Sequence, residues 1–374
     1  MPKYDLLLKG GRVLDPSQDL DCVCDVAVTK GVITGMAPDL SWTDAGRAID
    51  VSGTIVMPGL VDFHTHAYWG VCEYGVDPDL TFLPRGTTTI LDVGSAGAIT
   101  LPGFRHYVVE RSRTRIKALL HVNTAGMTHS VGELIGLQYL DPERTAAVAK
   151  ENADLIVGIK VRLSRNVAGE NDWQAFQAAR KAAELAGIPL MVHFGSSFTP
   201  LAQVLDAMRP GDILTHCFSG RANNIMDEKG RLLPEVWAAV RRGVNVDVGH
   251  GMGSFNFDTA SAALKQGLLP TTISSDLHAY SQPYPVIDLL TVMSKFVYVL
   301  GLPLGEVVRR ATAVPAQLLG LADVAGSLRV GAPADVAVVR ELAGQFELWD
   351  ADKNSRLSPN LLTPFLTLRA GEVF

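Results

Sequence analysis

Short apolar runs recur along the middle of the chain at intervals that suit a repeating unit of one strand and one helix. Eight of these runs are typical of buried strands: 59–63, 87–93, 118–122, 155–163, 189–194, 212–218, 244–248 and 271–275. Helical periodicity is clearest over 173–186 and 234–242, and a further helix is expected over 285–300. Strands that alternate with helices pair in parallel through right-handed crossovers. The pattern predicts an α/β fold with a TIM-like (β/α)8 barrel, and an open doubly wound sheet is the alternative.

The two ends of the chain show a different pattern. Short apolar stretches alternate with turns over residues 1–55, as in 5–11 and 26–31, and again over 326–374. This alternation is typical of antiparallel strands. Because neither end has enough strands for a stable sheet of its own, we expect both to combine. The predicted organisation is a small composite β-sandwich domain from 1–55 and 326–374 beside a barrel formed by 56–325.

Composition narrows the class of protein. The chain has 374 residues, 47% of them hydrophobic, and a formal net charge of -6 at pH 7. That size allows a large core, and the negative charge argues against nucleic-acid or membrane partners. Small molecules are therefore the expected partners, and a homo-oligomer is compatible with the sequence.

Two further features concern the compartment in which the protein works. The N-terminus lacks the basic and apolar regions of a secretory signal. The most apolar long stretch, 286–302, contains Asp288 and Lys295 and is therefore expected to be a core helix, not a membrane span. Four cysteines in a chain of this length do not form a disulfide framework. We expect a cytoplasmic protein with reduced thiols.

The most informative chemistry lies in the segment 56–66, where an apolar run ends in His64-Thr65-His66. Because strand side chains alternate between faces, both imidazoles point the same way. A histidine pair alone fits a packed core as well as a metal site. Four more residues each close an apolar strand-like run, in the order Lys160, His193, His216 and Asp276. In a barrel the carboxyl ends of the strands form the active site, and all six residues fall there.

These residues carry a resemblance to a known family. The Pro58-Gly59-Leu60-Val61-Asp62-x-His64-x-His66 segment, the ordered residues after it, and the segments 311–316 and 331–335 resemble the amidohydrolase superfamily of metal-dependent hydrolases. Segments 92–97 and 249–255 look most like its deacetylase-like subgroup, which is often labelled dihydroorotase. The resemblance covers nearly the whole chain. It implies a TIM-like barrel, a centre of two divalent metal ions that is usually filled by zinc, and hydrolysis of amide or ester bonds.

The resemblance also implies a role for each candidate ligand. His64, His66 and Asp276 would hold one ion, His193 and His216 the other, and a carboxylated Lys160 would span both. An unmodified lysine in this apolar run would be a costly buried ammonium, and addition of carbon dioxide would turn it into an anionic bridge. The alternative is an amine that reaches the barrel mouth. Bound metal lowers the pKa of water from about 15.7 to about 7, and Asp276 would carry the proton to the leaving group.

Four residues are candidates for contact with the substrate. Arg162 lies two residues after Lys160, hence on the same strand face, where a guanidinium could hold a substrate carboxylate. His250 stands in a loop whose glycines permit close backbone approach. His278 and Asn123 fit a structural role equally well. These residues favour a small anionic substrate.

A few other polar residues are expected to be structural. His106 and His129 stand in helix or loop contexts without a partner in the sequence, His121 lies inside a strand, and Cys217 should face away from the site. Asp62, on the same side as His64, is expected to be a buried, hydrogen-bonded carboxylate below the site.

Two classes of function follow from these residues. The first is an enzyme, a binuclear metallohydrolase that removes an acetyl or short acyl group from a small α-substituted carboxylic acid, or alternatively opens a cyclic amide or imide. The second is a non-catalytic assembly protein that keeps the barrel and loses its ligands. All six ligand positions are filled here, which favours the enzyme.

Overall fold

The computed structural model describes residues 2–129, 131–282 and 284–374. The larger domain is built around a seven-stranded parallel sheet, in which each strand pairs with the next along the chain. The strands are β6 (Leu60–Thr65), β7 (Thr87–Gly97), β8 (Arg115–His121), β9 (Ile156–Leu163), β10 (Leu190–Phe194), β11 (Ile213–Thr215) and β12 (Asn245–Val246).

The eighth predicted strand, 271–275, is reduced to isolated bridges. Thr272 bridges to Asp247 beyond β12, and Leu277 bridges to Thr65 at the end of β6, both in parallel. The segment therefore joins the two edges of the seven-stranded sheet. The barrel prediction is confirmed, with an eighth position that contributes two bridges instead of a regular strand.

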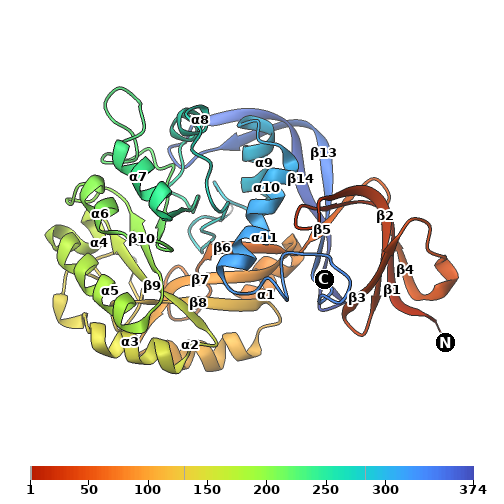
Figure 1. Ribbon diagram of the computed structural model, residues 1–374, viewed down its shortest axis with the longest axis horizontal. Coiled ribbons are helices and arrows are strands. Elements are labelled where there is room, and N and C mark those ends of the chain that lie inside the picture. Colours follow the sequence, from red (N-terminus) through yellow and green to blue (C-terminus); the bar gives the residue numbers. More distant parts are fainter. Residues whose placement is uncertain (1, 130, 283) are drawn as a thin grey trace.

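Helices surround the barrel on its outside (Figure 1). They are α1 (Pro78–Phe82), α2 (Leu101–Tyr107), α3 (Pro142–Glu151), α4 (Arg165–Ala168), α5 (Asp172–Ala186), α6 (Leu201–Ala207), α7 (Pro234–Arg242), α8 (Phe257–Lys265), α9 (Leu289–Ser294), α10 (Leu304–Ala311) and α11 (Ala313–Leu318). Short 3-10 turns lie at η1 (Trp42–Asp44), η2 (Leu83–Arg85), η3 (Val109–Arg111), η4 (Leu137–Tyr139) and η5 (Gly169–Asn171). Each helix within the described residues is too short or too polar to cross a membrane.

The helix expected over 285–300 is shorter than predicted. It begins at Leu289 because the Asp288 carboxylate caps it, accepting a hydrogen bond from the backbone N–H of Thr291 at 2.7 Å. Its last part is the π-helix η6 (Lys295–Val299). Lys295 is fully buried there, as a core helix requires.

Both ends of the chain form one mixed sheet. Its strands are β1 (Tyr4–Asp15), β2 (Leu20–Thr29), β3 (Val32–Ala37), β4 (Ala45–Asp50), β5 (Ile55–Pro58), β13 (Val336–Trp349), β14 (Ser355–Arg369) and β15 (Glu372–Val373). β5 lies where the two ends meet, parallel to β1 and antiparallel to β13. Figure 1 shows the N-terminal strands and the C-terminus at the same end of the molecule.

The β13–β14 hairpin connects this sheet to the barrel. It arches from the sheet over α8 and α9 (Figure 1). Leu348 and Leu362 belong to the main hydrophobic core, and the backbone N–H of Leu362 donates to the Ser294 hydroxyl at 3.0 Å. The hairpin thus packs the small sheet against the barrel at α9 and η6.

Candidate metal centre and active site

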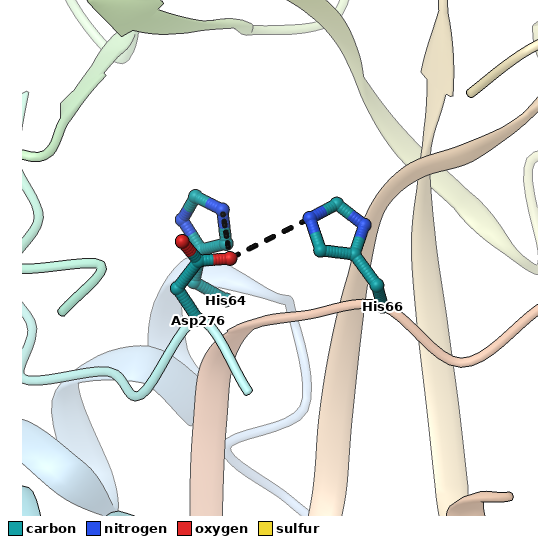
Figure 2. A group of neighbouring side chains, drawn as sticks. All are labelled: His64, His66 and Asp276. Atoms are coloured by element: carbon teal, nitrogen blue, oxygen red, sulfur yellow. Dashed lines mark ion pairs between the residues drawn. The ribbon is translucent and has the colours of Figure 1, made fainter. Parts of the chain in front are cut away.

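The six predicted ligands lie together at the carboxyl ends of the barrel strands. Five of them are buried, and His193 is partly buried. His64 and His66 end β6, and Asp276 stands in the bridging segment that closes the barrel. Figure 2 shows both imidazoles turned toward the Asp276 carboxylate, with Nε2 of His64 at 3.4 Å and Nε2 of His66 at 3.5 Å from Oδ1. These three residues can hold one metal ion.

The hydrogen-bond partner of Nδ1 determines which nitrogen of His64 carries a free lone pair. Nδ1 of His64 is 2.8 Å from the Thr215 hydroxyl, which itself donates to Asp247 at 2.7 Å. Nδ1 therefore carries the hydrogen, and Nε2 presents a lone pair to the Asp276 carboxylate. Two acceptor atoms 3.4 Å apart repel each other unless a cation lies between them. The arrangement fits a divalent metal.

A second pair of nitrogen atoms converges beside the first group. Nε2 of His216 lies 2.7 Å from Nδ1 of His193. The Gly249 carbonyl accepts from Nδ1 of His216 at 2.7 Å, so Nε2 of His216 carries a lone pair. Nε2 of His193 is 3.0 Å from the Ser164 hydroxyl, which can accept its hydrogen. Both inner nitrogens are then free to bind a second ion.

Burial keeps these imidazoles in the form that binds metals. It lowers the pKa of His66 to about 3 and that of His216 to about 4. The pKa values of His64 and His193 are also lowered well below the ordinary range by burial. All four rings are neutral at pH 7, and neutral imidazole is the metal ligand.

Lys160 lines the same cavity, and across the described residues its amine has no oxygen atom as a hydrogen-bond partner. Its amine is fully buried, and its hydrogen-bond partner among the described residues is the Met191 sulfur at 3.5 Å. Burial lowers the pKa of this amine to about 7, although the Asp276 carboxylate opposes the shift. A substantial neutral fraction at pH 7 is what addition of carbon dioxide requires. The environment therefore fits the carboxylated form better than a buried ammonium.

Two of the ligands have unusual backbone conformations. His216 has φ 63° and Asp276 has φ 48°, both in the left-handed region. Such conformations cost energy and persist where the surrounding structure enforces them. The carboxylate of Asp62 accepts a hydrogen bond from the Ser275 N–H at 2.9 Å and fixes the segment that carries Asp276. The predicted structural role of Asp62 is confirmed.

The glycine-rich loop after β12 packs against the ligands. A Cβ atom at Gly249 would lie 2.5 Å from the Thr215 hydroxyl and 3.0 Å from Nδ1 of His64. A Cβ at Gly251, where φ is +50°, would collide with the Asp276 carboxylate. Only glycine permits this approach without displacing a ligand.

A cavity of about 140 Å³ opens onto the ligands, and Arg162 forms part of its wall. Nη1 of Arg162 donates to Oε1 of Glu133 at 2.7 Å, and the guanidinium lies 5.4 Å from the centre of the Tyr74 ring. Arg162 therefore reaches the site as predicted, with its charge already paired. Local sequence patterns do not reveal this pair, because Glu133 comes from a loop about thirty residues upstream.

Of the other three predicted substrate contacts, one lines this cavity and two do not. His278 lines the cavity, and its ring centre lies 4.8 Å from that of Tyr74. His250 and Asn123 are not among the described residues that line this cavity. His250 is fully buried, with Nε2 at 2.9 Å from the Lys295 amine. The Asn123 amide donates to the Glu133 backbone carbonyl, at the edge of a neighbouring pocket.

Sequence reasoning missed the residues that orient the ligands. Asp247 receives hydroxyl hydrogen bonds from Thr215, Thr272 and Ser274, and burial raises its pKa to about 6. The available signal was an isolated acid inside the apolar run 244–248. The Ser95 hydroxyl, 3.0 Å from Nδ1 of His66, has no such signal.

A parallel barrel with converging imidazoles, a carboxylate and a buried lysine at the carboxyl ends of its strands defines a metal-dependent hydrolase. The chain belongs to the amidohydrolase family, whose model matches residues 55–357. It is therefore an enzyme of the class that hydrolyses C–N bonds, and the family generally uses two metal ions.

Individual relatives carry different activity names. A protein named deacetylase Atu3266 from Agrobacterium fabrum is 38% identical over 324 residues, covering 86% of this chain and 77% of the relative. A crystal structure described as an adenine deaminase has a TM-score of 0.90 and 31% identity, covering 99% of both chains. One described as a dihydroorotase has a TM-score of 0.90 and 32% identity, covering 99% of this chain and 97% of the other. The family and fold are thus settled by similarity, and the substrate has to be argued from the site.

Proposed function

We propose that this enzyme is a binuclear zinc hydrolase that removes an acetyl or another short acyl group from a small α-substituted carboxylic acid. The leaving group is an amine or an alcohol. The observation that carries the proposal is the presence of Arg162 in the same small cavity as the converging metal ligands. A carboxylate at Arg162 would place a neighbouring acyl carbonyl at the ligands.

Each ligand has a role in this proposal. His64, His66 and Asp276 would hold one ion, His193 and His216 would hold the other, and carboxylated Lys160 would supply oxygen ligands to both. When bound, such ions make hydroxide available at neutral pH and polarise a carbonyl group. Asp276 accepts the proton of the attacking water and delivers it to the leaving nitrogen or oxygen. The Asp247 and Thr215 pair keeps the His64 ring in the required tautomer.

Arg162 keeps donors available for the substrate. A guanidinium has five N–H groups, and the hydrogen bonds to Glu133 and Tyr74 use only part of them. The Glu133 and Tyr74 side chains fix its position and hold its pKa above the ordinary value, although burial opposes that effect. A fixed, permanently charged group at the cavity wall suits recognition of a small carboxylate.

A second candidate is the opening of a cyclic amide. The similarity to a solved dihydroorotase over nearly the full length favours it. Ring opening of dihydroorotate would use the same centre and would also need a cationic group to bind the substrate carboxylate. The two candidates differ in the bond that is broken, so one substrate panel separates them.

The first test is a rate screen of the zinc-loaded enzyme. It compares N-acetyl amino acids of both hands, O-acetyl hydroxy acids, dihydroorotate and hydantoins. Release of acetate is the expected result. Efficient ring opening without any deacylation would transfer the assignment to the cyclic-amide candidate.

The second test concerns Arg162. Arg162→Met should raise KM for the acid far more than for its neutral methyl ester, because a charge-assisted hydrogen bond is worth about 1.5 to 3 kcal/mol. The double variant Arg162→Met/Glu133→Gln avoids an unpaired buried carboxylate and should show the same selectivity. Equal losses on acid and ester would show that Arg162 does not contact the substrate carboxylate.

All four cysteines are free thiols in the structure. This supports the cytoplasm as the proposed location, because reduced thiols persist in reducing compartments.

A further inference from the structure

A second, polar cavity continues from the metal site. It measures about 350 Å³ and shares Arg162, His193, Gly253 and Ser254 with the first cavity. Its remaining wall is largely polar and includes Ser164, Asn166, Ser196, Ser219 and Arg221. We call this space the polar lobe. A substrate that places its acyl group at the metal ligands would extend its leaving group into this lobe.

The residue at the far side of the lobe, Arg221, is held in place. Its Nε donates to the Gly253 carbonyl at 3.3 Å, and its backbone N–H donates to the Ser219 hydroxyl at 3.2 Å. The same loop is tied down by Asn223, whose side chain donates to the Thr199 carbonyl at 2.8 Å and accepts from the Leu201 N–H at 3.0 Å. Arg221 is an exposed cation held through its Nε, and its terminal N–H groups have no hydrogen-bond partner among the described residues.

The charges around the two cavities are unequally compensated. Arg162 is paired with Glu133, and Lys160 is committed to the metal centre. Across the described residues, Arg221 forms no ion pair with a carboxylate within 4.0 Å, and no Asp or Glu side chain is found among those that line the lobe. The lobe therefore has an uncompensated positive charge and walls that offer hydroxyl and amide groups.

We propose that the polar lobe is a second anion subsite, and that the substrate is the N-acyl derivative of a dicarboxylic amino acid. This inference rests on the proposed function and deepens it. The α-carboxylate lies at Arg162, the acyl carbonyl at the metal ligands, and the side-chain carboxylate at Arg221. An alkyl side chain in the same place would strip water from several hydroxyl groups without replacing their hydrogen bonds, which is unfavourable.

The test compares a charged substrate with a neutral substrate of equal size and with a shorter apolar one. The zinc-loaded enzyme is assayed with N-acetylglutamate, N-acetylglutamine and N-acetylnorvaline, each in both enantiomeric forms. The preferred enantiomer of N-acetylglutamate should have a kcat/KM at least about tenfold above the other two compounds, since only it offers a charge-assisted hydrogen bond to Arg221.

Two variants distinguish a direct contact between Arg221 and the substrate from a general effect of positive charge near the site. Arg221→Met should remove the preference for N-acetylglutamate over N-acetylglutamine. Arg165→Met removes the same charge nearby, where the guanidinium packs over the Phe198 ring at 4.5 Å outside the lobe, and it should keep the preference. A preference that persists in Arg221→Met, or a wild-type enzyme that favours N-acetylnorvaline, would overturn the inference. So would an equal loss on all three compounds, because Arg221 would then contact the α-carboxylate.

A binding measurement keeps this inference separate from the proposed function. If no acyl compound of either hand is hydrolysed, the proposed deacylation is wrong. Calorimetric titration with glutamate and glutamine then still tests the lobe, since glutamate should bind wild-type enzyme at least about tenfold more tightly and Arg221→Met should abolish that difference. Equal binding of both amino acids by wild-type enzyme would overturn the subsite.

Discussion

Lys160 is the residue whose burial is hardest to explain without a metal centre. A fully buried amine with a sulfur atom as its hydrogen-bond partner is energetically costly, and the proposed bridging carbamate would remove that cost. Lys160→Ala should therefore lower kcat/KM by more than about 100-fold, the upper range seen when residues that support a metal ligand are lost. Short carboxylic acids such as formate or propionate should restore part of the activity, because they can occupy the gap between the ions.

A second buried lysine provides the control for this rescue. Lys295 is equally buried, but its amine donates to the Pro285 carbonyl at 3.0 Å and to His250. The activity of Lys295→Ala should not respond to carboxylic acids. Equal responses of both variants would contradict a carbamate at Lys160, as would an electron-density map with a plain amine between two occupied metals.

The convergence of the six candidate ligands could be predicted from the sequence because each ends an apolar run, and a barrel brings such ends together. The residues that form hydrogen bonds with these candidate ligands could not be predicted. Asp247 and Thr215 contact His64 across more than 150 residues of chain, and a sequence pattern carries no sign of such a pairing. His250 was expected near the substrate, yet its ring turns away toward Lys295, which local spacing cannot show.

At the scale of elements, the loop after β12 determines where Asp276 can lie. A methyl group at Gly251 would collide with the Asp276 carboxylate, so Gly251→Ala should displace this ligand and lower kcat/KM by at least about tenfold. Activity and thermal unfolding should be measured together, since the change also strains a backbone with φ +50°.

Gly267→Ala is the matched control for that strain. Gly267 has φ +92° and nothing within 4 Å of a Cβ atom, so its substitution adds strain without a collision. Gly267→Ala should lose roughly 1 kcal/mol of stability, and Gly251→Ala should lose at least as much because of its added collision. Only Gly251→Ala should lose most of its activity. Equal activity in the two variants would show that the loop does not position Asp276.

The elements of the barrel were largely predictable, and the exceptions have physical causes. The run 271–275 has the composition of a buried strand, but Asp276 adopts φ 48° and the neighbouring serines bond to Asp62 and Asp247. Side-chain hydrogen bonds thus replace part of the strand ladder. The π-helical turn at Lys295–Val299 also has no counterpart in a 3.6-residue pattern.

At the scale of the whole molecule, the small sheet and the barrel depend on each other. The β13–β14 hairpin contributes Leu348 and Leu362 to the main core. The sequence indicated that both ends combine, because neither has enough strands alone. It did not indicate that the hairpin reaches the barrel, since an alternating pattern shows which face is apolar and not what covers it.

The metal ions should stabilise the entire barrel, because their ligands come from five separate strand positions between His64 and Asp276. Close to two divalent ions per chain are expected by elemental analysis after growth with zinc. Removing them with a chelator should abolish activity and lower Tm, because a ligand present at 100 times its Kd stabilises the native state by about 2.7 kcal/mol. Adding zinc back should restore both properties. A chain that contains no metal after zinc supplementation, with activity and Tm indifferent to chelation, would rule out the metal centre.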